Sequence, residues 1–226
     1  MADAFRAVTL QEVQGDEELL AYMHMGDEYL GAIGYTEHGL RHGNLVAHIA
    51  GNICRRLGFD ERTAELAAIA GFIHDVGNCV SRLDHGISTA IIARDVLGSR
   101  FGMDPNEVAI VMNAVGNHEE EFGDPATAVA AAAIIADKSD VHHTRVRNAD
   151  PAKFDIHDRV NYAAKRSFLR VDADTRTLSL EIDTDTEESQ VMEYFEIFLS
   201  RMQMCRRAAQ VLDAKFSLVI NGLKLL

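Results

Sequence analysis

The sequence Gly71-Phe72-Ile73-His74-Asp75-Val76-Gly77-Asn78 places a histidine and an aspartate side by side at the end of an apolar run. This run predicts a helix that Gly77 stops, so that His74 and Asp75 lie in its last turn, where a chain end opens space for a ligand. Further side chains of the same two types recur at wide intervals on either side: His42, His85, His118 and Asp137. We predict that these six side chains form one metal site, which the rest of the chain builds or covers.

Apolar residues at helical spacing predict several more helices around this stretch. They span about residues 16–30, 36–57, 60–77, 84–97 and 104–117, and the last helix of the bundle begins near residue 124. Asp16, Thr36 and Asp60 are expected to cap the first three, and Asp104-Pro105 and Asp124-Pro125 to open the last two. The alanine-rich run Ala126–Ala136 must be tightly surrounded by other helices, and Asp137 follows it. The four histidines therefore lie on different helices, at or near an end or on an inward face.

The pattern changes after Asn148-Ala149-Asp150-Pro151. A short helix over about 156–164 precedes two half-buried strands and a long helix over about 188–212, and a third strand begins at Phe216. The long helix carries an apolar stripe at alternating spacings of four and three residues: Val191, Phe195, Phe198, Met202, Cys205, Ala209 and Leu212. Such a stripe packs on a sheet of its own chain or forms the seam of a homodimer. We expect a mainly α protein, with a helical bundle in residues 1–150 and a small C-terminal β-β-α-β module in residues 151–226.

Composition limits the class of protein. The chain has 226 residues, of which 47% are hydrophobic and 25% charged, as in ordinary globular proteins. Its three cysteines, Cys54, Cys79 and Cys205, are far apart, which argues against a disulfide framework and favours a reducing compartment. Residues 1–6 lack the pattern of a secretory signal, and the uncharged run 126–136 is too short to cross a bilayer. We expect a cytoplasmic protein without membrane contact.

The charge distribution is uneven along the chain. The net charge of −13 disfavours binding to a nucleic acid polymer. Residues 138–170, however, hold eight Lys or Arg against four Asp, and this basic stretch begins directly after Asp137. It forms either a solvated face or a cationic wall for an anionic substrate.

The predicted site depends on the combination of residues, because a single histidine on an apolar helix face is more often a core residue than a ligand. Asp75 and Asp137 lie at the ends of apolar stretches, where an unpaired buried carboxylate costs several kcal/mol by rough estimate. A divalent cation would offset that cost. Four imidazoles and two carboxylates without a thiolate suit Fe, Mn, Co, Ni or Zn better than Mg or Ca.

Three motifs carry a resemblance to a known family: Arg41-His42, Ile73-His74-Asp75-Val76-Gly77 and Ile135-Ala136-Asp137-Lys138. Over roughly residues 36–147, the chain resembles the HD-domain metal-dependent phosphohydrolases, which are helical bundles. The resemblance implies that a first metal is held by four side chains: His42, His74, Asp75 and Asp137. His85 and His118 match two further histidines of a subset that binds two metals. In that subset Asp75 would bridge the two ions and act in catalysis by helping to activate a shared hydroxide.

Two departures from the family pattern concern the substrate. Asn78 stands where many relatives have a lysine that can meet a phosphate, and the Gly-Tyr-Pro motif of the cyclic-dinucleotide branch is absent. Substrate binding could instead fall to Lys138, Arg145 and Arg147, or these could be surface residues. His142 and His143 could line the same wall or be solvated. A second His-Asp pair, His157-Asp158, is interpreted as incidental, because nothing near it in the sequence completes a site.

These observations favour a metal-dependent phosphohydrolase, either a phosphatase or a phosphodiesterase, that hydrolyses a nucleotide or related small phosphoester through a hydroxide bridging two divalent transition metal ions. The alternative is a non-catalytic HD-domain sensor that binds metal and nucleotide and signals through its C-terminal module. The complete ligand set favours the enzyme, since a sensor would be free to lose ligands. A metal-free group of pH-responsive core histidines would leave Asp75 and Asp137 unexplained.

Overall fold

The computed structural model of the chain describes residues 5–226. Residues 1–4, on which the expectation of no secretory signal partly depends, lie outside the described residues. The α-helices are α1 (Leu10–Gln14), α2 (Glu17–Ala32), α3 (Leu40–Arg56), α4 (Glu61–Ile73), α5 (His85–Ala93), α6 (Pro105–Gly116), α7 (Ala128–Lys138), α8 (Ile156–Ala163) and α9 (Val191–Val211). The short 3-10 helices are η1 (Val76–Cys79), η3 (His143–Arg145) and η4 (Pro151–Lys153), and η2 (Arg94–Arg100) is a π-helix that continues α5. The strands are β1 (Ala164–Asp172), β2 (Thr177–Thr184), β3 (Lys215–Ile220) and β4 (Leu223–Lys224).

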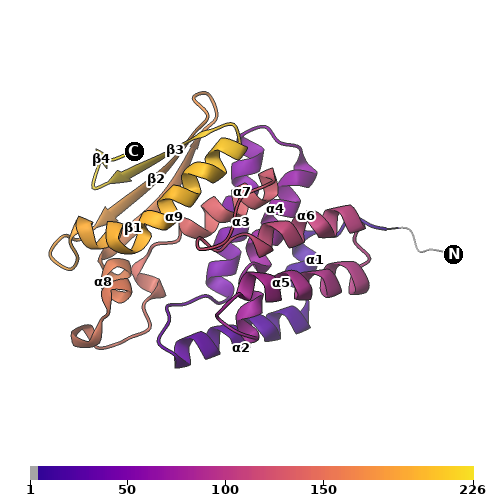
Figure 1. Cartoon of the computed structure of the whole chain (residues 1–226), viewed down its shortest axis with the longest axis horizontal. Helices are drawn as coiled ribbons and strands as arrows, with labels where there is room; N and C mark the ends of the chain where they lie inside the picture. Colours follow the sequence, from indigo (N-terminus) through magenta and orange to yellow (C-terminus); the bar gives the residue numbers. More distant parts are fainter. Residues whose placement is uncertain (1–4) are drawn as a thin grey trace.

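Helix α7 lies at the centre of the helical bundle. It packs against α3, α4, α6 and α9, and all of its residues from Ala130 to Ala136 are buried. Figure 1 shows the bundle with the C-terminal sheet at one end and α9 lying between the sheet and α7. The small alanine side chains let four helices approach α7 closely, as the sequence predicts. The mainly α fold class with a C-terminal module is confirmed.

Three of the five predicted polar caps lie where the sequence predicts them. The side chains of Asp16, Asp60 and Asp104 each accept a hydrogen bond from a backbone N–H in the first turn of the following helix. Two predicted caps are wrong. Helix α3 begins at Leu40 rather than after Thr36, because the backbone N–H groups of residues 38 and 39 donate to carboxylates. Helix α7 begins three residues after Pro125, with Thr127 as its cap.

Gly77 acts through close packing rather than as a helix stop. Helix α4 ends at Ile73, and His74 occupies its C-cap position. A Cβ atom built on Gly77 would lie 2.2 Å from the His85 carbonyl oxygen and 2.6 Å from the Thr89 nitrogen. Only glycine therefore allows η1 to lie directly against the start of α5. This contact brings the segment of Asp75 next to that of His85.

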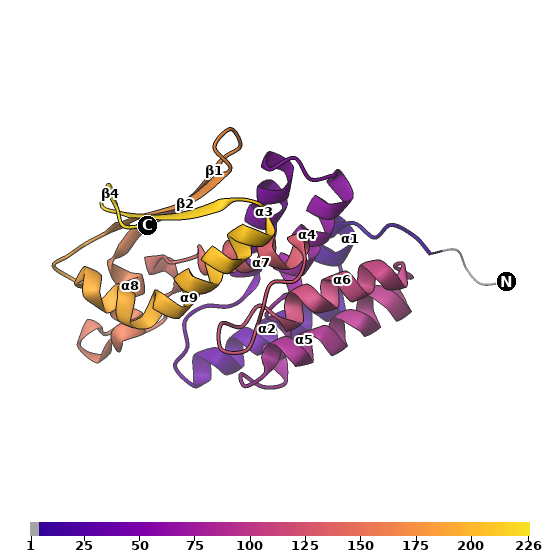
Figure 2. The same cartoon turned by 45° about the horizontal axis from the view of Figure 1, so that its top comes forward.

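The C-terminal sheet has the strand order β1-β2-β3-β4. Strands β1 and β2 form an antiparallel hairpin in which Leu169 pairs with Leu180 and Val171 with Leu178. Strand β3 returns parallel to β2 through the α9 crossover, and β4, which the sequence analysis did not include, extends the edge. Figure 2 shows α9 running along one face of this sheet, toward the bundle.

The apolar stripe of α9 is used within the chain. Phe198, Met202, Cys205, Ala209 and Leu212 are all buried, and α9 packs against α7 and β3. This outcome matches the interpretation of the stripe as an intramolecular packing face. None of the helices in residues 5–226 is both long and apolar enough to cross a bilayer.

Candidate metal centre

The six predicted ligands meet at one point in the bundle, although they come from separate segments. His42 is in the first turn of α3, His74 caps α4, Asp75 precedes η1, His85 begins α5, His118 follows α6, and Asp137 is in the last turn of α7. The Nε2 atoms of His42 and His74 are 3.2 Å apart, and those of His85 and His118 are 2.9 Å apart. The histidines therefore form two pairs, each with its Nε2 atoms turned toward one another.

The other ring nitrogen of each histidine is held by an acceptor. The Nδ1 atom of His42 lies 2.7 Å from Asp140 Oδ2, and those of His74, His85 and His118 lie 2.6–3.0 Å from the carbonyl oxygens of Gly71, Arg82 and Val115. In the neutral ring, donation from Nδ1–H leaves a lone pair on Nε2 that can bind a metal ion. This arrangement fixes ring orientation in metal-binding histidines. Asp140 follows Asp137 by three residues, but nothing in the sequence identified it as the partner of His42.

Asp75 lies between the two histidine pairs. Its Oδ2 atom is 3.3 Å from His74 Nε2 and 3.7 Å from His42 Nε2. Its Oδ1 atom is 3.1 Å from His85 Nε2 and 3.7 Å from His118 Nε2. Each carboxylate oxygen thus faces one pair, as a carboxylate bridging two ions would.

Asp137 lies beside the pair formed by His42 and His74. Its Oδ1 atom lies 3.3 Å from His42 Nε2, and its Oδ2 atom forms an ion pair with Lys138 Nζ at 2.7 Å. The Lys138 ammonium is buried and also contacts Glu120 at 2.8 Å, and Glu120 in turn contacts Arg201 of α9 at 2.9 Å. Lys138 therefore holds one oxygen of Asp137 and leaves the other facing the histidines.

The electrostatics of this cluster require positive charge at its centre. Burial would lower the pKa of His74, but the carboxylates of Asp75 and Asp137 raise it to about 10. Burial would raise the pKa of Asp137, but the charges of Lys138 and His74 hold it well below its ordinary value. The pKa of Asp75 is likewise held low, against burial, mainly by the charge of His74. Without a metal, a proton on His74 supplies the charge that a cation would otherwise bring.

The residues fit divalent cations. The Oδ2 atom of Asp75 is buried and has no hydrogen-bond partner in the described part of the chain. Ligands about 2.1 Å from one ion lie roughly 3 Å apart when they are adjacent, which matches the spacing within each histidine pair. Two groups of potential ligand atoms are compact enough to hold an ion: His42, His74 and Asp75, and Asp75, His85 and His118. Asp75 belongs to both groups.

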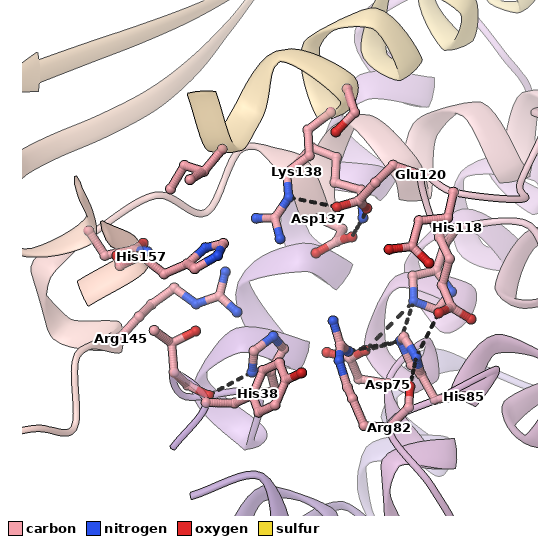
Figure 3. Close-up of a pocket in the computed structure, with 18 of the residues that line it drawn as sticks. His38, Asp75, Arg82, His85, His118, Glu120, Asp137, Lys138, Arg145 and His157 are labelled. Carbon is pink, nitrogen blue, oxygen red and sulfur yellow. Dashed lines mark hydrogen bonds and ion pairs between the residues drawn. The ribbon is translucent and has the colours of Figure 1, made fainter. Parts of the chain in front are cut away.

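A cavity of about 850 Å³ opens onto this cluster. Figure 3 shows Lys138, Asp137 and Glu120 along one side, with Asp75, His85 and Arg82 across from them. The cavity then extends to segments that the sequence analysis did not connect with the site: Ile33–Thr36, Glu119–Glu121, the start of α8 and the middle of α9. The C-terminal module therefore supplies part of the wall.

The three predicted substrate residues lie in different surroundings. Lys138 and Arg145 line the cavity, but both are already engaged. The guanidinium of Arg145 donates to the backbone carbonyls of Glu37 and Asp140. Arg147 is not among the lining residues and forms an ion pair with Asp27 of α2. The structure therefore brings two of the three to the site.

Other residues singled out in the sequence also have defined positions. His157 and Asp158 of α8 both line the cavity, which nothing near them in the sequence indicates. The interpretation of this pair as incidental stays a prediction. His142 lines a separate cavity of about 400 Å³ between α3 and β1. Asn78 is buried against Gly26 of α2 and does not line the large cavity, so a phosphate-binding residue is not expected there.

The sequence is similar to parts of known proteins. Ribonuclease Y of Lawsonia intracellularis is 33% identical over 96 residues, which are 42% of this chain and 17% of that protein. Ribonuclease Y of Aquifex aeolicus is 35% identical over 100 residues, or 44% of this chain and 16% of that protein. The chain thus spans about a sixth of the length of these relatives.

A crystal structure of a predicted HD superfamily hydrolase from an uncultured Thermotogales bacterium has a TM-score of 0.45 and 24% identity, covering 60% of this chain and 75% of that one. The sequence pattern of the HD domain matches residues 39–145, which contain all six predicted ligands. Residues 39–145 of this chain therefore match the HD domain.

Proposed function

We propose that the chain is a metal-dependent phosphohydrolase that hydrolyses a nucleotide or a related small phosphoester. The observation that carries this proposal is the position of Asp75, whose two oxygens face two separate histidine pairs. Such an arrangement suits two divalent transition metal ions with a shared carboxylate. His42, His74, Asp75 and Asp137 would hold one ion, and Asp75, His85 and His118 the other.

Two ions in these positions would supply Lewis-acid charge for a phosphoryl group and lower the pKa of water to near neutrality. The chain's own residues set up that chemistry. The Nδ1 hydrogen bonds keep four imidazole rings oriented before any ion binds. Lys138 holds one oxygen of Asp137 and so directs the other toward the histidines.

The charge of the cavity supports an anionic substrate only when metal is bound. Seven carboxyl side chains line it, against four Lys or Arg side chains. Without ions this wall has a net negative charge and repels phosphate, whereas two divalent cations would reverse its sign. The volume of about 850 Å³ lies in the range of small-molecule sites and would accommodate a nucleotide.

The identity to ribonuclease Y favours a second candidate, an RNA phosphodiester. That likeness covers less than half of this chain, and the net charge of −13 weighs against a polymeric polyanion. A mononucleotide or a short phosphoester therefore remains our proposal. The same assay separates the two candidates if it includes both small phosphoesters and oligoribonucleotides.

The test is metal analysis of the purified protein together with hydrolysis of a phosphoester panel under Mn²⁺. We expect two ions per chain, turnover of at least one small phosphoester, and loss of turnover by at least about 1000-fold in Asp75→Ala, since a shared ligand of both ions is removed. His24→Ala is the matched control, because His24 lies exposed on α2 and forms an ion pair with the exposed Glu28.

Three outcomes would contradict the proposal or part of it. Bound metal without turnover of any phosphoester would favour a non-catalytic sensor. Turnover restricted to oligoribonucleotides would favour the RNA candidate. One ion per chain, with His85→Ala and His118→Ala fully active, would overturn the dinuclear site alone.

A further inference from the structure

Arg82 differs from the other cations of the cavity. The four that line it are Arg82, Lys138, Arg145 and Arg201. Lys138 and Arg201 share Glu120, and Arg145 donates to backbone carbonyls. Within residues 5–226, Arg82 alone among these four has neither a carboxylate nor a carbonyl partner. Among these four, its charge is therefore the one that no carboxylate or carbonyl of residues 5–226 offsets.

The contacts of Arg82 place its guanidinium at the edge of the metal cluster. Its Nη1 atom lies 3.3 Å from His85 Nε2, and its Cζ atom lies 5.2 Å from the ring centre of Tyr35. Figure 3 shows the side chain beside Asp75 and His85, directed into the cavity. A cation over an aromatic face is held without being neutralised, so the Tyr35 ring positions the guanidinium and leaves its N–H groups free.

The hydrogen bond to His85 cannot persist when a metal is bound. The Nδ1 atom of His85 is engaged by the Arg82 carbonyl oxygen, so its Nε2 atom has a single lone pair. That lone pair cannot accept from Arg82 and ligate an ion at once. An ion at His85 would therefore release the guanidinium, which would then need an anionic acceptor beside the metals.

We propose that Arg82 is the phosphate-binding residue of this site and takes the place of a lysine near Asn78. This inference rests on the proposed function, since it names the group that receives the substrate's phosphoryl oxygens. A guanidinium offers two parallel N–H donors that match two phosphoryl oxygens. Asn78 itself is buried away from the cavity and cannot serve.

The test measures binding of inorganic phosphate to the Mn²⁺-loaded protein by calorimetry, together with metal content and metal affinity. Arg82→Ala should weaken phosphate binding by about 10- to 100-fold, as expected for loss of a charge-assisted bidentate contact. It should retain its metal, with equal or tighter affinity, because a neighbouring positive charge has been removed. Arg82→Lys should recover part of the phosphate affinity.

Two further variants sharpen the result. Tyr35→Ala should weaken phosphate binding by only about 2- to 5-fold, whereas Tyr35→Phe, which keeps the ring, should bind normally. Arg170→Ala is the matched control, since Arg170 lies on β1 and pairs with Glu181. Equal phosphate affinity in Arg82→Ala and wild type would overturn the role of Arg82 and leave the proposed function standing.

Two other outcomes would also overturn the proposal. Loss of metal in Arg82→Ala would show that Arg82 supports the ligands rather than the phosphate. A wild-type protein that binds two ions but no phosphate and hydrolyses no phosphoester would overturn both the proposed function and the role of Arg82. The two failures are therefore distinguishable, because only the second affects the wild-type protein.

Discussion

Asp140 links the metal cluster to the surrounding structure. Its carboxylate accepts from His42 Nδ1 at 2.7 Å and pairs with Arg41 at 2.8 Å. Burial would raise its pKa, but the hydrogen bond from His42 and the charge of Arg145 hold the pKa far below the ordinary value for an aspartate. These contacts favour the carboxylate form of Asp140, which strengthens His42 as a ligand.

This position predicts the effect of changing Asp140 to asparagine. The amide keeps the shape and one acceptor but lacks the charge, so we expect metal affinity at the group containing His42 to fall by about 10- to 100-fold. Metal titration of the purified variant measures the loss. Asp213→Asn, at a side chain that is 97% exposed, should leave the affinity unchanged. Unchanged affinity in both variants would contradict the role given to Asp140.

Glu120 makes stability depend on pH. Burial would raise its pKa, but the charges of Lys138 and Arg201 hold it well below its ordinary value. An unfolded glutamate titrates near about pH 4.3, so the stabilisation is fully present above that value and is lost as the pH falls through the folded pKa. In the metal-free protein, Glu120→Gln should lower the free energy of unfolding by about 1.5–3 kcal/mol at neutrality.

That difference should shrink as the pH falls from about 5 to about 2, because the unfolded wild-type chain takes up a proton on Glu120 in this range while the folded chain resists protonation. Urea denaturation of both proteins across this range measures it. Glu187→Gln, on the exposed turn before α9, should change stability by less than about 0.5 kcal/mol throughout. If the free energy of unfolding of Glu120→Gln stayed below that of wild type by a constant amount down to about pH 2, the ion-pair explanation would be contradicted.

At the scale of elements, the contact between η1 and α5 sets the distance between the two histidine pairs. Gly77→Ala would force a methyl group against the His85 carbonyl oxygen and the Thr89 nitrogen. Backbone atoms cannot move aside as a flexible side chain can, so we expect a loss of about 1–3 kcal/mol in unfolding free energy. The affinity for a metal ion at Asp75, His85 and His118 should fall as well.

Thermal unfolding and metal titration check this expectation. Gly116→Ala is the matched control: its added methyl group would meet only the Ala90 side chain, at an ordinary 3.8 Å. This change should be neutral or slightly stabilising, because alanine favours a helix over glycine. If Gly77→Ala proved as stable as Gly116→Ala, the close approach of η1 and α5 would not be essential.

Helix patterns predicted most of the elements, whereas the joint site of six ligands was predicted from the combination of residue types and the resemblance to HD domains. They succeed because apolar spacing and polar caps are local properties, and each predicted ligand lies at a helix end or on an inward face. The patterns fail where a contact with a residue outside the helix determines where that helix begins. Thr127 rather than Asp124-Pro125 begins α7, and Thr36 is displaced as a cap by backbone hydrogen bonds to Glu37 and Asp27.

The same reason explains which site residues the sequence did not reveal. Arg201 lies 64 positions after Asp137, yet it joins the ion-pair series that ends at this carboxylate. His157-Asp158 is isolated in the sequence but faces the cavity once α8 is folded back. These contacts depend on how the C-terminal module packs against the bundle, and local sequence patterns do not predict that packing.

At the scale of the whole molecule, we propose that residues 1–150 and 151–226 unfold together. The buried stripe of α9 packs against α7, and Arg201 of α9 contacts Glu120 of the bundle. Amide hydrogen exchange should therefore give similar maximal protection for α7 and α9, with a single cooperative transition. Clearly weaker protection throughout α9 would show that the C-terminal module opens independently.

The excess of carboxyl groups in the large cavity has a kinetic consequence. A phosphoester approaching the ion-free chain meets a repulsive field, which the incoming ions would reverse. Assembly should then follow a compulsory order, with cations before substrate, and the ion-free chain should have no measurable affinity for nucleotide. In a cell starved of transition metals, such a protein would be inactive and would not bind nucleotides. Its activity would therefore depend on the available metal concentration.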